Sequence, residues 1–350
     1  MKILKVKASG EYDILIGEGI LDGIADAATP VIRGGKAAVV TDSNVAPIYL
    51  ERVLDSLKRK GVESFSHVIE AGESSKDLKH LGALLNAFAE DGLTRADVVI
   101  ALGGGVTGDL AGFAASCYLR GVRYIQIPTT LLAMVDSSVG GKTAIDLDYG
   151  KNLAGAFYQP SLVLCDHSTL STLPDEVFTD GCAEVIKYGI IADAELFDRL
   201  KDPIKPQIED VIYDCVRIKR DVVEEDEKDT GLRQILNFGH TIGHAVEKLS
   251  SYTISHGKAV AIGSAMISRA AAKRGICTSE YAEEITQLLS SYGLPTFTSY
   301  DPGMLFRAAV ADKKRTGEYI NLILPVEKGR CIIKRTPFSE LEAMIREGME

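Results

Sequence analysis

The first half of the chain alternates short β-branched and apolar runs with helical patterns of apolar residues. The runs predict strands at residues 37–41, 64–69, 97–102, 124–127 and 162–164, and residues 1–7 alternate as a strand does. Between them, residues 48–60 and 78–91 carry apolar positions three and four apart, as amphipathic helices do. Strands separated by helices pair in parallel, so we predict a doubly wound, Rossmann-like α/β domain over residues 1–175.

From about residue 174 the hydrophobic pattern becomes helical throughout. Helices are predicted at residues 176–200, 206–227, 240–249, 258–274, 279–292 and 302–311, with one hairpin formed by residues 319–325 and 331–334. The fold class is therefore α/β followed by a mostly helical second domain, residues 176–350. The sequence has no repeat and no long linker, so we expect the halves to pack tightly around a cleft, where ligand sites are common.

Composition narrows the classes of protein. At 350 residues the chain exceeds the size of one hydrophobic core, which also favours two domains. A net charge of −10 argues against a nucleic-acid partner. No apolar run reaches the length of a membrane helix, no signal peptide is recognisable, and the six cysteines are scattered singly. We therefore expect a cytoplasmic protein without a membrane partner.

A glycine-rich turn follows the predicted strand at residues 97–102. Gly103, Gly105 and Gly108 satisfy the Gly-x-Gly-x-x-Gly pattern, which lets backbone N–H groups and a helix N-terminus hold a pyrophosphate. A tight turn that needs positive φ is the alternative. Asp42 ends the strand at 37–41 and can meet ribose hydroxyls, which favours NAD over NADP.

The segment at residues 128–143, with residues 150–152, is rich in small polar residues and lysine, a composition typical of functional loops. Its Gly141-Lys142-Thr143 resembles the end of a phosphate-binding P-loop, but Asp136 stands where that motif requires glycine. Several cations can meet phosphate or carboxylate oxygens, or be ordinary solvated charges. They are Lys142, Lys151, Lys187, Lys219 and Arg233.

Three of the six histidines fall in two neighbouring polar segments. His240 and His244 lie one turn apart on a predicted helix, and His256 follows in Ser255-His256-Gly257-Lys258. Imidazole is the commonest zinc ligand, and Glu184, an acid among small and apolar residues, can supply a carboxylate. The alternative is a helix with surface histidines and an ordinary buried acid.

Taken together, these motifs resemble the 3-dehydroquinate synthase family. The resemblance runs from about residue 42 to residue 324 and rests on residues 72–76, 103–109, 118–121, 128–143, 150–152, 183–189, 236–244 and 256–257. It implies conversion of 3-deoxy-D-arabino-heptulosonate 7-phosphate to 3-dehydroquinate and phosphate, in the shikimate pathway of aromatic amino acid biosynthesis. The implied steps are transient oxidation by NAD, phosphate elimination, reduction, ring opening and intramolecular aldol closure.

The resemblance also implies roles for individual residues. The metal ligands would be Glu184, His240 and His256, holding one divalent ion, zinc most often and cobalt as an alternative; His244 would relay protons. Substrate contacts would come from Asp136, Lys142, Asn152, Lys187, Lys219, Arg233, Asn237 and one of Lys313 and Lys314, with Arg120 reaching in from the partner of a homodimer. NAD contacts would come from Asp42, Asn44, Glu73, Lys76, Gly103, Gly104, Gly105, Val106, Thr107, Gly108, Asp109, Thr129, Thr130, Lys142, Lys151, Thr169, Leu170, Ser171 and Thr172.

At three places the sequence departs from the residues that are usual in this family, namely Met134, the segment at residues 146–148 and Lys258.

Three alternative functions stay open. A related sugar phosphate cyclase would act on sedoheptulose 7-phosphate or glucose 6-phosphate, but such relatives tend to change residues near Arg233, Asn237 and His244. A metal-dependent polyol dehydrogenase of the same fold would release NADH, and those enzymes usually carry Asp in place of Glu184. A catalytically silent NAD-binding module is disfavoured because several costly polar clusters coexist.

Overall fold

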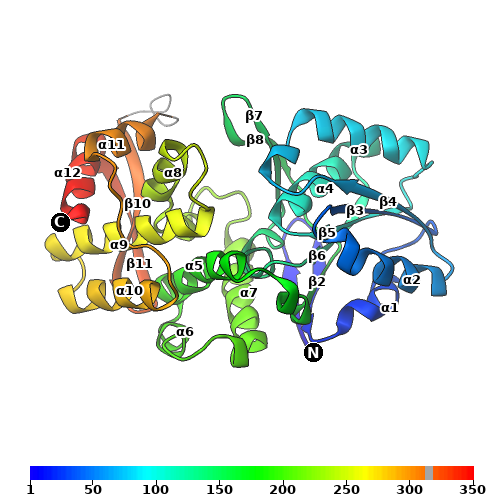
Figure 1. The fold of residues 1–350 in the computed structure, drawn as a ribbon, viewed down its shortest axis with the longest axis horizontal. Coiled ribbons are helices and arrows are strands. Elements are labelled where there is room, and N and C mark those ends of the chain that lie inside the picture. The colour runs from blue at the N-terminus through cyan, green and yellow to red at the C-terminus, as the bar shows by residue number, and fades with distance from the viewer. Residues whose placement is uncertain (312–317) are drawn as a thin grey trace. The chain divides into compact units, whose positions relative to one another are not determined.

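The computed structural model describes residues 1–311 and 318–350, which form two compact units (Figure 1). Unit 1 comprises Met1–Leu173 and Ile208–Lys228, and unit 2 comprises Pro174–Gln207 and Asp229–Glu350. The boundary near residue 174 falls where the hydrophobic pattern changes. Helix α7 (Ile208–Glu225) differs from the sequence-based division, because it packs on β1 (Lys2–Lys7), β2 (Glu11–Gly17) and η5 (Ala133–Ser137) of unit 1. Periodicity identifies such a helix but not the surface that it covers.

Unit 1 is built on a seven-stranded sheet in the order β1-β2-β9-β6-β5-β3-β4. Its strands are β1 (Lys2–Lys7), β2 (Glu11–Gly17), β3 (Lys36–Asp42), β4 (Glu63–Ile69), β5 (Val98–Gly103), β6 (Arg123–Pro128) and β9 (Leu162–Asp166). The pairing of β1 with β2 is antiparallel and all other pairings are parallel. The six predicted strands are confirmed; β2 was not predicted, although Tyr12, Ile14 and Ile16 alternate as buried positions.

Helices cover both faces of this sheet, which confirms the doubly wound prediction. Residues of α1 (Ile24–Ala28) and α2 (Glu51–Arg59) pack on one face, on a core that includes Val39 and Ile100. Residues of α3 (Leu78–Glu90) and α4 (Gly105–Cys117) pack on the other, on a core that includes Val40 and Ala101. Because successive strand residues point to opposite faces, strands buried on both sides are apolar throughout.

The strand order reverses between β3 and β5. Strand β3 pairs with β4 on one side and with β5 on the other, in a register that puts Thr41 opposite Leu102. Asp42 and Gly103 therefore end neighbouring strands at the same edge of the sheet. In doubly wound sheets, ligands bind outside the carboxyl ends of the strands at such a reversal.

The polar segment after β6 is more ordered than the loop that its composition indicates. Residues Ala133–Ser137 form the helical turn η5, and β7 (Lys142–Leu147) pairs antiparallel with β8 (Gly150–Phe157). This correction has a simple cause. Only the inner strand β7 carries buried apolar positions such as Ile145, so the hydrophobic alternation is weak.

Unit 2 is mostly helical, as predicted. It contains α5 (Asp175–Ala192), α6 (Ala194–Arg199), α8 (His240–Leu249), α9 (His256–Lys273), α10 (Ser279–Ser291), α11 (Pro302–Val310), α12 (Phe338–Met349) and the hairpin β10 (Tyr319–Glu327) with β11 (Arg330–Pro337). Helix α9 contacts α5, α8, α10 and α12. The predicted helix at 176–200 breaks at Asp193, which caps α6, and α12 was not predicted.

Among the described residues, no helix is both long and apolar enough to cross a membrane. All six cysteines are free thiols. Burial raises the pKa of Cys182 to about 12, so this thiol stays protonated and unreactive at neutral pH.

Candidate active site

Close crossing of α8 and α9 brings the histidines of unit 2 together. Gly239, the residue before α8, has φ of 77°, and a Cβ there would lie 2.2 Å from Ser264 Oγ. A Cβ at Gly263 would lie 2.0 Å from the Gly239 carbonyl oxygen. Glycine at both positions therefore lets the two backbones meet, because no side chain separates them.

The three imidazoles converge at this crossing. Ring centroids lie 5.3 Å apart for His240 and His244, 5.2 Å for His240 and His256, and 6.0 Å for His244 and His256. The carboxylate of Glu184, on α5, is completely buried beside them. Its Oε1 lies 3.6 Å from His240 Nε2 and 3.5 Å from His256 Nε2.

The two oxygens of Glu184 have different partners. Lys187, one turn further along α5 and also buried, forms an ion pair with Oε2. Both imidazole Nε2 atoms approach Oε1 instead. Lys187 therefore compensates part of the carboxylate charge and leaves Oε1 directed at the two histidines.

The other ring nitrogen of each histidine also has an acceptor. His240 Nδ1 lies 2.9 Å from the Phe238 carbonyl oxygen, and His256 Nδ1 lies 3.4 Å from Oε2 of Glu247. An imidazole whose proton is held on Nδ1 offers the Nε2 lone pair to a metal. Both rings therefore direct Nε2 toward Glu184 and have an acceptor for a proton on Nδ1, an arrangement that suits a metal ligand.

The geometry of this trio fits a divalent metal. Ligand atoms of Glu184, His240 and His256 all lie within 4.8 Å of one another. A tetrahedral site with zinc bonds of about 2.0–2.1 Å has edges of about 3.3 Å, close to the observed separations of 3.5 and 3.6 Å. Two nitrogen donors and one carboxylate are a common set for catalytic zinc, which keeps a fourth position open.

The two histidines differ in protonation. Burial lowers the pKa of His240 to about 3, against the opposing charge of Glu184, so the ring is neutral and ready to coordinate. Burial also disfavours charge on His256, but hydrogen bonds with Glu184 and Glu247 outweigh it and raise its pKa to about 10. As a metal ligand, His256 would have to give up that proton, because coordination requires the neutral ring.

His244, the second member of the His-x-x-x-His motif, lies in a different setting. Its side chain is 61% exposed, and its Nε2 lies 4.0 Å from Glu247 Oε2. A second group of potential ligand atoms joins His244, Glu247 and His256. Glu247 was not predicted, although its place seven residues after His240 puts it on the same helix face.

Asp180 also belongs to this neighbourhood and was not predicted. Its Oδ1 accepts hydrogen bonds from the Ser255 hydroxyl and from the Lys258 backbone N–H at 3.0 Å, at the start of α9. A Cβ at Gly257 would lie 2.0 Å from the Asp180 carbonyl oxygen. Helix α5, which carries Glu184, thus holds the first turn of α9, which carries His256. Lys258 differs from the residue usual in the family, but only its backbone N–H takes part in this contact. The difference therefore leaves the hydrogen bond to Asp180 intact.

In unit 1 the glycine-rich turn begins α4. Gly104 precedes the helix without a side-chain cap, and neither Gly103 nor Gly105 has positive φ. These glycines are needed for space instead. A Cβ at Gly103 would lie 2.6 Å from Thr107 Oγ1, and one at Gly108 would lie 2.6 Å from Gln126 Oε1. The positive-φ alternative is therefore wrong for these positions, and glycine is needed because the backbone packs closely against Thr107 and Gln126.

Polar side chains surround this turn. Asp42 Oδ1 accepts the backbone N–H of Asn44 at 2.9 Å, and its Oδ2 accepts the Thr107 hydroxyl at 3.2 Å. Thr129 donates its backbone N–H to the Gly103 carbonyl at 2.9 Å. Within the described residues, the buried Thr129 hydroxyl has no hydrogen-bond partner. A buried hydroxyl at the carboxyl end of β6 is thus available to a ligand.

A polar network around the buried Lys76 links α4 with the β7–β8 hairpin. Lys76 Nζ lies 2.6 Å from Asp109 Oδ2 and 2.6 Å from Asn152 Oδ1, and 3.9 Å from Glu73. Burial disfavours the charged ammonium, but Asp109 outweighs it and raises the pKa of Lys76. Asn152, at φ of 58°, also donates its backbone N–H to Asp146. Asp146, one of the unusual positions, therefore supports the backbone of a predicted site residue.

The remaining predicted NAD residues all lie in unit 1. Lys151 Nζ is 3.7 Å from Glu73, and Thr130 Oγ1 accepts the Ala133 N–H at 3.2 Å. The turn η6 (His167–Thr172) contains Thr169, Leu170, Ser171 and Thr172. The hydroxyl of Thr172 lies 2.7 Å from that of Tyr49.

The predicted substrate residues are divided between the units. In unit 1, Lys219 Nζ on α7 lies 2.6 Å from Asp136 Oδ1, and Lys142 is exposed at the start of β7. Arg120 is exposed on a turn in which it and Leu119 have positive φ. In unit 2, Arg233 and Asn237 lie on η8 (Leu232–Asn237), the first buried and the second exposed. Lys313 and Lys314 lie outside the described residues.

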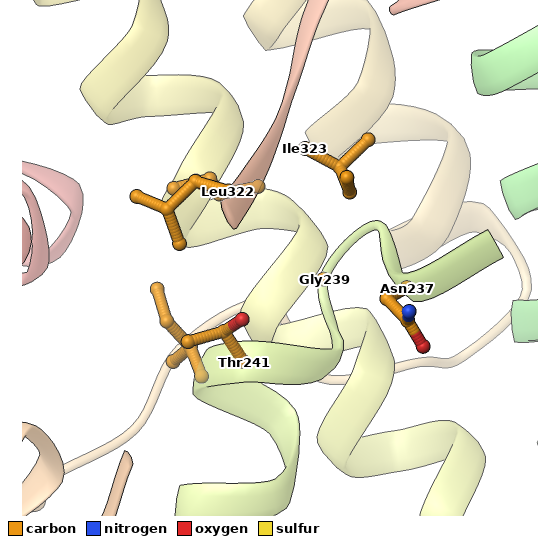
Figure 2. Close-up of a pocket in the computed structure, with 7 residues that line it drawn as sticks. Asn237, Gly239, Thr241, Leu322 and Ile323 are labelled. Carbon is orange, nitrogen blue, oxygen red and sulfur yellow. The ribbon is translucent and has the colours of Figure 1, made fainter. Parts of the chain in front are cut away.

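Figure 2 shows a small pocket in unit 2, with Asn237 and Gly239 on one side of it and strand β10 on another. Leu322, Ile323, Ile242 and Ile267 give it an apolar lining. None of the three histidines lines this pocket, so it is distinct from the ligand cluster.

Comparison with solved structures first defines the class. A 2-deoxy-scyllo-inosose synthase complexed with carbaglucose-6-phosphate, NAD+ and Co2+ superposes with a TM-score of 0.88 at 26% identity, covering 99% of this chain and 100% of that chain. A 2-epi-5-epi-valiolone synthase from Streptomyces hygroscopicus with NAD+ and Zn2+ bound gives 0.88 at 29% identity, covering 99% of each chain. NADH-dependent butanol dehydrogenase A from Thermotoga maritima gives 0.67 at 14% identity, with 96% of each covered, which shows the fold alone. The fold is that of the sugar phosphate cyclases, shared with iron-containing alcohol dehydrogenases.

Sequence comparison then defines the family. The models for the 3-dehydroquinate synthase N-terminal and C-terminal regions match residues 66–180 and 181–315. The 3-dehydroquinate synthase of Clostridium perfringens is 47% identical over 96% of this chain and 98% of its own, and that of Clostridium acetobutylicum is 43% identical over 99% of both. The chain belongs to the 3-dehydroquinate synthase family of enzymes, as its motifs predicted.

Proposed function

We propose that this chain converts 3-deoxy-D-arabino-heptulosonate 7-phosphate to 3-dehydroquinate and inorganic phosphate. The observation that carries the proposal is the convergence of Glu184, His240 and His256 beside His244, in a chain 43–47% identical to 3-dehydroquinate synthases over nearly its whole length. A catalytically silent nucleotide-binding module would have no use for this buried polar cluster, because burying it costs free energy.

Unit 2 would hold the metal through Glu184 Oε1 and the Nε2 atoms of His240 and His256, with zinc first and cobalt as the alternative. Bound there, the cation would supply Lewis acidity for oxidation of a substrate hydroxyl. The Zn2+ and Co2+ of the two related cyclase structures support the choice of metal. His244 would move protons. Its exposed ring lies beside the proposed ligands and is grouped with Glu247 and His256.

Unit 1 would bind NAD at the reversal of its sheet. Backbone N–H groups from Gly103 to Gly105, at the uncapped start of α4, would hold the pyrophosphate, and Asp42 would meet a ribose. When bound, NAD would accept a hydride and return it later in the same turnover. The predicted residues at Asn44, Lys76, Asp109, Thr129 and Thr130 would complete the contacts, and the NAD+ of the related cyclases supports this choice.

The substrate would be held by cations and amides. Lys219 is buried and paired with Asp136, so its ammonium is fixed in position. Arg233 presents a planar fork suited to a carboxylate or phosphate. Lys142, Asn152, Lys187 and Asn237 would complete the set by the family resemblance.

The enzyme would act as a homodimer in which Arg120 serves the partner's site. Its support is the exposed turn at Leu119 and Arg120, where two consecutive non-glycine residues keep left-handed φ at a cost of about 1–3 kcal/mol each. Inactive Arg120→Ala mixed with inactive His256→Ala should regain activity through hybrid dimers. No recovery despite demonstrated subunit exchange contradicts the shared site.

Phosphate release tests the reaction itself. The protein is incubated with sub-stoichiometric NAD and, side by side, 3-deoxy-D-arabino-heptulosonate 7-phosphate, sedoheptulose 7-phosphate or glucose 6-phosphate. We expect many phosphates per NAD from the first compound, without a lasting rise in NADH absorbance. Turnover of another sugar phosphate would assign a different cyclase, and steady NADH accumulation would assign a dehydrogenase.

A further inference from the structure

Glu247 is a buried carboxylate that neither the sequence motifs nor the proposed ligand set assign. It lies on α8, on the face that carries His240 and His244, and is 4% exposed. Its Oε2 lies 3.4 Å from His256 Nδ1 and 4.0 Å from His244 Nε2. Burying a carboxylate is costly unless it is paired, and these imidazoles are partners that offset the cost.

We infer that Glu247 is a positioning residue of the metal site, accepting the Nδ1 proton of His256 so that the Nε2 atom of this ring faces the cation. The inference rests on the proposed function, because it assumes that Glu184, His240 and His256 bind the metal. Carboxylates behind histidine ligands fix the tautomer and raise the donor strength of the ring.

The two histidine ligands differ in a way that supports this role. His240 receives its orientation from a neutral acceptor in its own chain segment, the Phe238 carbonyl at 2.9 Å. His240 and His256 are the first residues of α8 and α9, where the helix dipole disfavours a nearby cation. Only His256 has a charged acceptor at Nδ1, and Glu247 offsets the dipole there because it places a negative charge behind the ring.

The net charge of the buried cluster also supports the positioning role of Glu247. The Glu184 carboxylate is already paired with Lys187 through Oε2. A divalent ion held by Glu184 and two neutral imidazoles would therefore leave the buried cluster, with Lys187, at a net charge of +2. Glu247 lowers that charge to +1, which favours metal binding in a region where charges are weakly screened.

The test measures metal affinity of the full-length protein, stripped and reloaded with Zn2+ or Co2+. Three variants are compared with the wild type: Glu247→Ala, Glu247→Gln and the control Asp91→Asn. Asp91 forms a similar carboxylate–imidazole pair with His67 in unit 1, at 2.7 Å. Competition with a chromophoric chelator gives the Zn2+ affinity, and visible absorption of bound Co2+ reports the ligand geometry.

We expect Glu247→Ala to bind Zn2+ about 10–100-fold more weakly, the range typical of residues behind metal ligands. Glu247→Gln should lose less, since its amide oxygen still accepts the Nδ1 proton while the charge is removed. The Co2+ spectrum should change in Glu247→Ala, and Asp91→Asn should match the wild type in both measurements. Unfolding of the metal-free proteins separates this effect from a general loss of stability, which would not weaken metal affinity by itself.

Wild-type Zn2+ affinity in both Glu247 variants would overturn the inference. Binding of two ions per chain would also overturn it, because His244, Glu247 and His256 would then be ligands of a second metal. Failure of the proposed function has a different signature. If Glu184→Ala retains the metal, the ligand set itself is wrong, whereas loss in Glu184→Ala with no effect at Glu247 contradicts the positioning role alone.

Discussion

The two units build their candidate sites from different materials. In unit 1 the glycine-rich turn offers backbone groups, and the residues around it follow the carboxyl ends of adjacent strands. In unit 2 the candidate metal site consists of side chains from three helices, α5, α8 and α9. A substitution in unit 1 should therefore act mainly through shape, whereas one in unit 2 should remove a donor atom.

The ion pair of the buried Lys76 with the partly buried Asp109 in unit 1 is the exception to this contrast, and it provides the largest expected effect. Lys76→Met removes the ammonium that pairs with Asp109 and Asn152. Loss of one partner of a buried pair costs about 3–5 kcal/mol, because the other charge stays buried without compensation. Denaturant unfolding of the metal- and NAD-free protein measures this change in the free energy of unfolding.

A double-mutant cycle checks the cause of that loss. Lys76→Met combined with Asp109→Asn should recover part of the stability, since both charges are then absent. Additive losses in the double variant would mean that the pair contributes little and that Lys76 acts through packing.

The next effect concerns unit 2 and compares the proposed ligand His256 with its neighbour His244. His256→Ala should lose Zn2+ affinity by at least about 100-fold, or about 2.7 kcal/mol, because a donor atom is removed. His244→Ala should keep the metal and lose turnover. Metal content after dialysis and phosphate release measure the two properties. A metal-free His244 variant would show that the His-x-x-x-His pair binds the metal jointly.

The contrast between the units also explains what the sequence could predict. Gly103, Gly105 and Gly108 follow their strand directly, so a local pattern was enough to find the turn. The convergence of His240, His244 and His256 was likewise predicted, because helical spacing places two of them on one face. The carboxylate ligand was harder to choose, since Glu184 reaches the cluster only through the packing of α5 on α9.

Other features could not be predicted because they depend on tertiary packing. Helix α7 was visible in the pattern, but its packing on β1 and β2 was not. The hairpin of β7 and β8 buries few apolar positions, so its composition indicated a loop. Asp180 is an ordinary acid in the sequence, and only the packing of α5 on α9 brings it to the turn that carries His256. Glu247 shares a helix face with His240, but only the crossing of α8 and α9 brings it to His256.

A matched pair of glycines tests the role of shape in unit 1. Gly103→Ala would put a Cβ 2.6 Å from Thr107 Oγ1 and 3.1 Å from Asp42 Oδ2, so we expect a loss of about 1–3 kcal/mol and weaker NAD binding. Gly82→Ala, within α3, meets no atom within 4 Å and should stabilise the helix by up to about 1 kcal/mol. Thermal unfolding and NAD titration measure both. Unchanged NAD binding in Gly103→Ala would contradict a pyrophosphate site at this turn.

The smallest expected effect tests whether unit 2 depends on helix placement as well as on donor atoms. Asp180→Ala removes the acceptor for Ser255 and for the Lys258 N–H at the start of α9, a loss of about 0.5–2 kcal/mol. Because this turn carries His256, Zn2+ affinity should fall too, by less than in Glu247→Ala.

Two further variants serve as controls. Asp180→Asn, which retains an acceptor oxygen, should restore most of the stability and most of the Zn2+ affinity. Asp301→Ala removes the cap of α11 and should cost similar stability without changing Zn2+ affinity. Equal Zn2+ affinities in the Asp180 and Asp301 alanine variants would mean that Asp180 stabilises the start of α9 but does not place His256.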